Sequence, residues 1–271
     1  MKTANMHPHG PVGEQLRGWR QRRRRSQLDL ALDAEVSARH ISFLETGRSQ
    51  PSRQMVLRLA EQLDIPLRER NTLLVAAGYA PMYAETPLDM DEPAMRVARQ
   101  AIELVLAGHE PYPALAIDRH WNMTGANRAV GMFLEGIAPE LLQPPINVLR
   151  LSLHPAGLAP RIVNLRQWHE HILARLLRQI DATADPVLVA LHAELAGYPL
   201  PEQADDVADD TYGNLVLPLR IRTERTERAD EGVLAFFTTT TLFGTPNDIT
   251  LAELAIESFF PADAATAAVF R

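Results

Sequence analysis

The 271-residue sequence contains no cysteine and no run approaching about twenty apolar residues. Without cysteine there is no disulfide framework and no thiolate for catalysis, which agrees with a reducing compartment. The absence of a long apolar run leaves no candidate for a membrane-spanning helix. The first residues, MKTANMHPHGPVG, also lack the apolar stretch of a secretion signal. We therefore expect a cytoplasmic protein that does not act in a membrane.

The familiar motifs of catalysis are absent as well: the sequence has no GxSxG elbow, Walker loop or GxGxxG fingerprint. His169 and His171 flank a glutamate, but residues two apart on a helix point about 200° from each other, so they cannot hold one ion. We expect these two, with His154 and His192, to be surface or hydrogen-bonded histidines. The sequence thus predicts no metal, no cofactor and no enzyme activity.

Charge is divided unevenly along the chain, although the total is only -7. Residues 1–83 hold 13 Lys and Arg against 8 Asp and Glu, a net charge of +5, and the remaining 188 residues carry -12. The densest basic block is Arg17, Arg20 and Arg22 to Arg25. An anionic polymer is the natural partner of such a block. A solvated basic helix end is the alternative.

Helical periodicity governs the first part of the chain. Apolar residues three or four apart predict five short helices within residues 12–77, with no alternating strand pattern. Ser37 is a good N-cap for the third helix, which stops at Gly47, and Ser52 caps the fourth. Pro66 opens the fifth. We predict an all-α domain over residues 1–78.

The second and third of these helices have the spacing of a helix-turn-helix. Ala31 is small where the helices cross, and Ile41 and Leu44 anchor the third helix inward. Arg39 on its outer face can donate two hydrogen bonds to guanine, and Phe43 can contact a thymine methyl. The predicted DNA contacts, with phosphate contacts at the flanks, are Gln27, Ser37, Ala38, Arg39, Ser42, Phe43, Arg48, Ser49 and Arg53.

The segment QLDLALDAEVSARHISFLETGRSQPS resembles the XRE (Cro/repressor-type) helix-turn-helix family, and the resemblance spans residues 13–77. It implies a domain that reads double-stranded DNA. One departure is Glu35, at a turn position where the family often has glycine because the backbone tends to positive φ. A non-glycine residue there costs on the order of 1 kcal/mol. A helical bundle that binds only protein is the alternative.

A connector and a second domain follow. Residues 79–93, YAPMYAETPLDMDEP, contain three prolines and four acids and predict a linker that continues into a helix over 93–106. From 107 to 271 the pattern predicts a PAS-like α/β domain in which helices are inserted between the second and third strands of a five-stranded antiparallel meander and pack on one face. The predicted elements are two strands around Asp118-Arg119, a helix over 126–134, helices over 165–180 and 186–197, and strands in 215–223, 232–244 and 250–259.

The segments ALAIDRHWNMTGANRAV, NVLRLSLHPAGLAPRIVN and TLFGTPNDITLAELAIESFFPAD resemble the ligand-binding domain of MmyB-like XRE regulators. The resemblance implies a pocket for a small, largely apolar ligand, for instance one like a fatty acid. Candidate ligand contacts are Trp121, Phe133, Arg150, Trp168, Phe236 and Phe237. Aromatic residues at these spacings also build ordinary cores, and an arginine is often simply solvated.

Together these observations predict a sequence-specific transcriptional regulator, most simply a repressor, whose operator affinity changes when an apolar ligand binds the second domain. We expect a homodimer on a palindromic operator, because one helix-turn-helix buries little surface and two-fold pairing multiplies affinity. Two alternatives stay open. The second domain could serve only dimerisation or partner docking without a ligand, or it could be an enzyme that the first domain tethers to DNA.

Overall fold

The computed structural model describes residues 11–201, 216–223, 232–244 and 246–270. The chain divides into two compact units. The first comprises Met1–Thr86 with Asp181–Thr183 and Asn247–Ile249, and the second comprises the remainder.

The first unit contains the five predicted helices. Their N-caps explain where three of them begin: the Ser26, Ser37 and Ser52 side chains each accept a hydrogen bond from a backbone N–H in the first turn. Leu16, Leu30 and other apolar side chains from all five helices form one buried core. The helices are α1 (Val12–Arg22), α2 (Gln27–Asp33), α3 (Ala38–Glu45), α4 (Arg53–Gln62) and α5 (Leu67–Ala76).

The turn between α2 and α3 has the conformation that its sequence position predicts. Glu35 adopts a positive φ of 54°, and the next residue, Val36, donates its N–H to the carbonyl of Ala31 over 2.9 Å. Ala31 and Ala34 are fully buried at the helix crossing. The helix-turn-helix geometry is therefore present although the turn lacks glycine.

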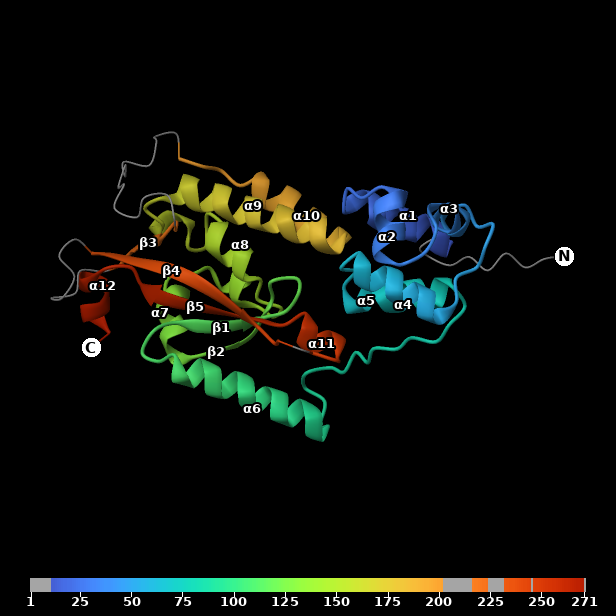
Figure 1. Ribbon diagram of the computed structural model, residues 1–271. Helices are drawn as coiled ribbons and strands as arrows, with labels where there is room; N and C mark the ends of the chain where they lie inside the picture. The colour runs from blue at the N-terminus through green and yellow to red at the C-terminus, as the bar shows by residue number, and fades with distance from the viewer. Residues whose placement is uncertain (1–10, 202–215, 224–231, 245, 271) are drawn as a thin grey trace. The chain divides into compact units, whose positions relative to one another are not determined.

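The second unit is built on a five-stranded antiparallel sheet with the order β2-β1-β5-β4-β3 (Figure 1). The predicted simple meander is wrong, because β5 is the central strand and pairs with β1 on one side and β4 on the other. Glu257, for example, lies opposite Leu115 of β1 and Thr240 of β4. The strands are β1 (Ala114–Ile117), β2 (Met123–Ala126), β3 (Leu219–Arg222), β4 (Val233–Leu242) and β5 (Ala255–Pro261).

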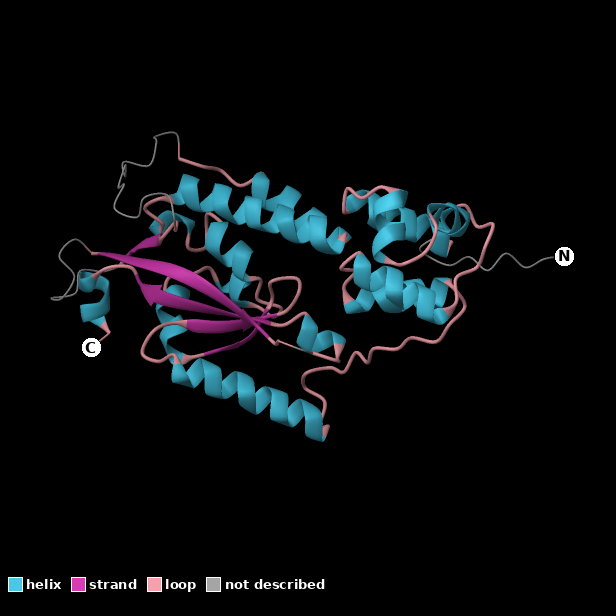
Figure 2. Ribbon diagram, viewed as in Figure 1, coloured by secondary structure: helices cyan, strands magenta, loops and turns pink. Residues whose placement is uncertain are grey.

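Helices cover both faces of this sheet (Figure 2). The segment between β2 and β3 packs on the face that carries Leu115 and Ile117, as predicted for the inserted helices. The helix predicted only as a connector, α6, packs on the opposite face against Ala114 and Ala116. The helices of this unit are α6 (Pro93–Gly108), α7 (Gly131–Leu134), α8 (Val148–Leu153), α9 (Leu165–Thr183), α10 (Pro186–Ala196), α11 (Ile249–Ala252) and α12 (Ala264–Val269).

Two predicted boundaries need correction. Ala126 ends β2 because it pairs with Leu115, so the predicted helix over 126–134 becomes a 3-10 turn followed by α7. Thr250 lies in α11 rather than in the last strand, which begins at Ala255. Leu215 lies outside the described residues. None of the helices in the described part of the chain is long and apolar enough to cross a membrane.

Candidate functional site

The outer face of α3 and the segment that follows it carry a cluster of two arginines and one aromatic ring. The guanidinium carbon of Arg39 lies 5.2 Å from the ring centre of Phe43, and that of Arg48 lies 5.8 Å from the same ring. Both arginines are exposed. Such cation-π contacts orient a guanidinium without neutralising its charge. The face thus presents two positioned cations and an apolar ring edge, the groups that read guanine and thymine in a major groove.

The other predicted DNA contacts surround this cluster. Ser37 caps α3, since its hydroxyl accepts the His40 N–H over 3.1 Å, and Arg53 is exposed at the first position of α4. The Gln27 side chain instead donates to a carboxylate oxygen of Glu45 over 2.8 Å, so part of its amide serves the fold. The partly buried positions are Ala38, Ser42 and Ser49.

A buried ion pair fixes the far end of α3. Arg20 of α1 donates through Nε and Nη2 to the two carboxylate oxygens of Glu45, at 2.6 and 2.9 Å. The Glu45 side chain is only 3% exposed. Hydrogen bonding to this carboxylate raises the pKa of Arg20 above its usual value. The pair holds α3 against α1, and the face bearing Arg39 points outward as a result.

Much of the basic run serves structure rather than an external anion. Arg23 donates through Nε and Nη2 to the carbonyls of Leu63 and Asp64, and Arg25 donates to the carbonyl of Gln62. These carbonyls lie at the C-terminal end of α4 and just beyond it, where a helix leaves acceptors unsatisfied. The basic block therefore caps a helix as well as charging the surface.

The second unit contains a pocket lined by residues from all five strands and from α7, α8 and α9. Its empty volume is about 650 Å³, including the open solvent at its mouth. Fourteen of the eighteen lining residues are apolar. Of the predicted contacts, Trp121, Phe133 and Trp168 line it. An apolar lining of this kind favours an apolar ligand, because binding removes that surface from water.

The other three predicted ligand contacts are not part of the lining. Phe236 is fully buried behind the wall, with its ring against Phe133. The next residue along β4, Phe237, stacks on Phe260 at a ring distance of 5.5 Å. Arg150 forms a bidentate ion pair with Glu194, both bonds being 2.7 Å. An arginine neutralised in this way outside the lining has no charge to offer the pocket.

Four polar residues of the lining were not predicted: Ser152, Arg175, Thr238 and Glu257. The helix and strand periodicity of the sequence could have predicted two of them. Arg175 follows Ile172 by three residues on α9, and Glu257 precedes Phe259 by two on β5, so each points the same way as an inward neighbour. Both were overlooked because charged side chains seldom point into a core.

Trp121 is held in its place in the pocket wall by a tight turn between β1 and β2. It has a positive φ of 68°, which is unfavourable for a bulky residue. Asp118 closes the turn by accepting the backbone N–H groups of His120 and Asn122, each over 2.8 Å. The indole N–H donates to Gln179 of α9 over 2.7 Å. The ring is thus fixed from both sides.

Two known families match the chain, one over each part of it. The family described as "MmyB-like transcription regulator ligand binding domain" matches residues 98–271, and the family described as "Helix-turn-helix domain" matches residues 11–73. The chain belongs to the MmyB-like transcription regulators. This regulator therefore binds DNA through its first domain and carries a ligand-binding domain after it. No curated protein matches the chain.

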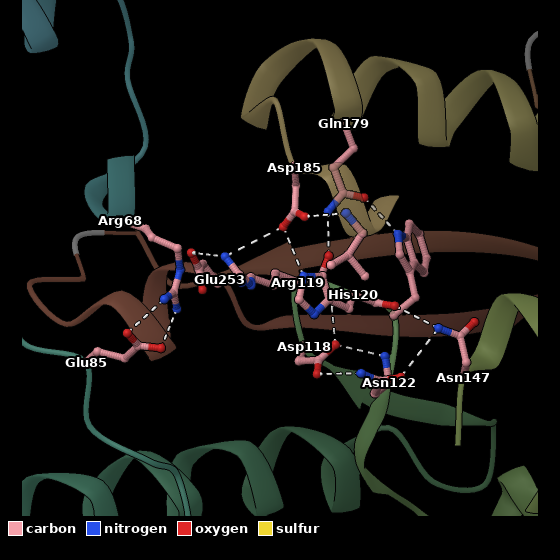
Figure 3. A network of polar contacts seen from close by, with 12 residues as sticks. Arg68, Glu85, Asp118, Arg119, His120, Asn122, Asn147, Gln179, Asp185 and Glu253 are labelled. Atoms are coloured by element: carbon pink, nitrogen blue, oxygen red, sulfur yellow. Dashed lines mark hydrogen bonds and ion pairs between the residues drawn. The ribbon is translucent and has the colours of Figure 1, made fainter. Parts of the chain in front are cut away.

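The same turn of the regulator reaches the start of α10. Asp185 caps this helix by accepting the Val187 N–H, and it also accepts the ring N–H of His120 over 2.9 Å (Figure 3). Burial raises the pKa of Asp185, but those two hydrogen bonds and the charge of Arg119 outweigh it, so the pKa lies below its usual value. Arg119 also lies 3.7 Å from Glu253.

The histidines that invite a metal hypothesis in this regulator have other roles. His169 is buried, with Nε2 donating to the carbonyl of Leu195 over 2.9 Å. The ring of His171 stacks on Trp168 at 5.6 Å. Burial, followed by the charges of Arg175 and Arg178, lowers the pKa of His171. Within the described ranges no three His, Cys, Asp or Glu side chains are grouped to hold a metal ion.

Proposed function

We propose that this regulator is a dimeric repressor whose affinity for a palindromic operator is controlled by a small apolar molecule in its second domain. In this proposal residues 1–78 bind DNA, residues 79–106 connect, and residues 107–271 sense the ligand. The observation that carries the proposal is the apolar pocket, because it belongs to a chain whose first domain binds DNA.

For DNA recognition, we propose that Arg39 reads a guanine and that Phe43 contacts a neighbouring thymine methyl. Arg48 and Arg53 would contact phosphates, which position the domain without specifying sequence. Support comes from the exposure of the three arginines and from the stacking of Arg39 and Arg48 on Phe43. Dimerisation rests on a physical argument: two recognition helices one helical turn of DNA apart multiply a modest affinity.

Native mass spectrometry of the purified full-length protein tests the ligand. We expect one apolar molecule per subunit, which denaturation releases unchanged, in a complex with the mass of a dimer. A dimer that is consistently free of any molecule would instead favour a docking role for the second domain. If the identified molecule is added back to the protein and a chemically different compound is recovered, an enzyme would be favoured.

Fluorescence anisotropy with an operator selected from random DNA tests regulation. If the released molecule acts as effector, adding it should change operator affinity at least about tenfold, a coupling of about 1.4 kcal/mol. An operator affinity that does not depend on the molecule would contradict ligand control while leaving DNA binding intact.

A further inference from the structure

The wall of the apolar pocket contains one ion pair, in which the carboxylate is buried and the arginine is partly exposed. Arg175 of α9 donates through Nη1 to Oε2 of Glu257 over 3.1 Å, and its Nη2 donates to Oε1 of the same carboxylate. The side chain of Glu257 is only 6% exposed, although it projects from the central strand of the sheet. Both residues line the pocket.

The pair is held in a closed arrangement. Thr240, opposite Glu257 in the neighbouring strand, donates its hydroxyl to Oε1 over 2.9 Å and also accepts from Nη2 of Arg175. The guanidinium carbon of Arg175 lies 4.5 Å from the ring centre of Trp121. Arg175 is therefore paired with Glu257, bonded through both Nη atoms and stacked on Trp121 before any ligand enters.

The charges decide which ligand the pocket accepts. Its lining contains one cation and one anion, so the net charge is zero. A carboxylate ligand would compete with Glu257 for Arg175 and would bring a second anion into a largely apolar space, where an unpaired charge is costly. An ammonium ligand would meet the same difficulty at Arg175. An uncharged ligand avoids both.

We propose that this pocket selects an uncharged amphiphile, such as a long-chain alcohol, and that Glu257 excludes the corresponding carboxylic acid. The inference rests on the proposed function, in which the pocket holds a small apolar ligand. Hydroxyl groups of Ser152 and Thr238 also line the pocket. The Ser152 oxygen accepts the Trp168 indole N–H over 2.9 Å, which orients its own hydrogen for donation. A ligand hydroxyl can pair with such groups without introducing charge.

Isothermal titration calorimetry of the full-length protein with 1-decanol, decanoate and decylammonium tests this selectivity. We expect 1-decanol to bind at least about tenfold more tightly than either ion. Decanoate that binds as tightly as 1-decanol would overturn the inference and leave the ligand site standing. Failure of all three probes to bind would overturn the ligand site and the inference together.

Two variants separate selectivity from stability. Glu257→Gln keeps the side-chain shape but frees the charge of Arg175, so decanoate affinity should rise about tenfold while 1-decanol affinity changes less than about threefold. The matched control is Glu194→Gln, which frees Arg150 outside the pocket and should alter neither affinity. Equal decanoate affinity in the Glu257→Gln variant and in the natural protein would contradict the role of Glu257. The comparison of the three probes on the natural protein does not depend on either variant.

Discussion

Arg20 and Glu45 join the first and third helices through two parallel hydrogen bonds buried behind the outer face of α3. The carboxylate has a third donor, the side-chain amide of Gln27, so α2 is tied to the same point. Three helices thus meet at one carboxylate. The arrangement sets the orientation of α3, because Glu45 is its last residue.

Replacing Glu45 with glutamine should destabilise the first domain. The guanidinium of Arg20 would remain buried without its counter-charge, which costs about 2–4 kcal/mol. Urea unfolding of the full-length protein, followed by far-UV circular dichroism, measures the loss. Glu85→Gln breaks the exposed ion pair with Arg68 and serves as the control, with an expected change below about 1 kcal/mol. Equal effects of the two substitutions would show that burial of the first pair contributes nothing.

Two glycines of α1 should respond to alanine in opposite directions. At Gly13 a Cβ atom would lie 2.3 Å from the carbonyl oxygen of Leu44, so Gly13→Ala must push α1 away from α3 at a cost of about 1–3 kcal/mol. At Gly18 nothing lies within 4 Å of such an atom. Gly18→Ala should therefore stabilise the helix by up to about 1 kcal/mol. Thermal unfolding of the two variants gives the comparison, and a neutral Gly13→Ala would refute the close approach of α1 and α3.

Arg39 and Arg53 should differ in what they contribute to DNA binding. Arg39→Ala should cost about 1–3 kcal/mol and relax preference at one operator position. Arg53→Ala should weaken binding to all sequences alike and lower the slope of affinity against salt by about one unit. Anisotropy titrations against the operator and its single-base variants distinguish the two patterns. Unchanged sequence preference in Arg39→Ala would place base recognition elsewhere.

Stability of the second domain should fall in mild acid because of His171. Its pKa is lower in the folded state than in the unfolded chain, so the unfolded state binds more protons once the pH drops below the usual histidine pKa of about 6.5. The contribution is complete above that pH and is lost as the pH falls through the folded pKa. Urea unfolding between about pH 7.5 and about pH 5.5 should therefore show a smaller loss in His171→Gln than in the natural protein. Parallel losses would contradict a lowered pKa.

Local patterns in the sequence predicted most of the first domain. Serine caps and three-to-four spacing located its helices, and the position of Glu35 in the motif anticipated a positive φ. The pairing of Arg20 with Glu45 could not be predicted, because the two residues are far apart in sequence and each is chemically ordinary. Sequence separation also hides the role of the basic run, since Arg23 and Arg25 donate to carbonyls at the C-terminal end of α4, about forty residues away.

The second domain was predictable in its elements but not in their order. Alternation and β-branched residues indicate strands, yet no local signal states that β5 lies between β1 and β4. Three aromatic pocket residues, Trp121, Phe133 and Trp168, were predicted, whereas Phe259 was not. Arg175 and Glu257 were missed because only their mutual contact makes a buried charge tolerable, and that contact depends on the packing of α9 over β5.

The central place of β5 also has a consequence for synthesis. The residues that build the five-helix core are all translated within the first third of the chain. In contrast, Ala114 of β1 pairs with Ser258 of β5, so the central strand of the sheet is synthesised almost last. A ribosome that stops short of β5 would release a chain with a complete DNA-binding domain and an unfinished sensor. In the proposed mechanism, such a product would bind operators without responding to an effector.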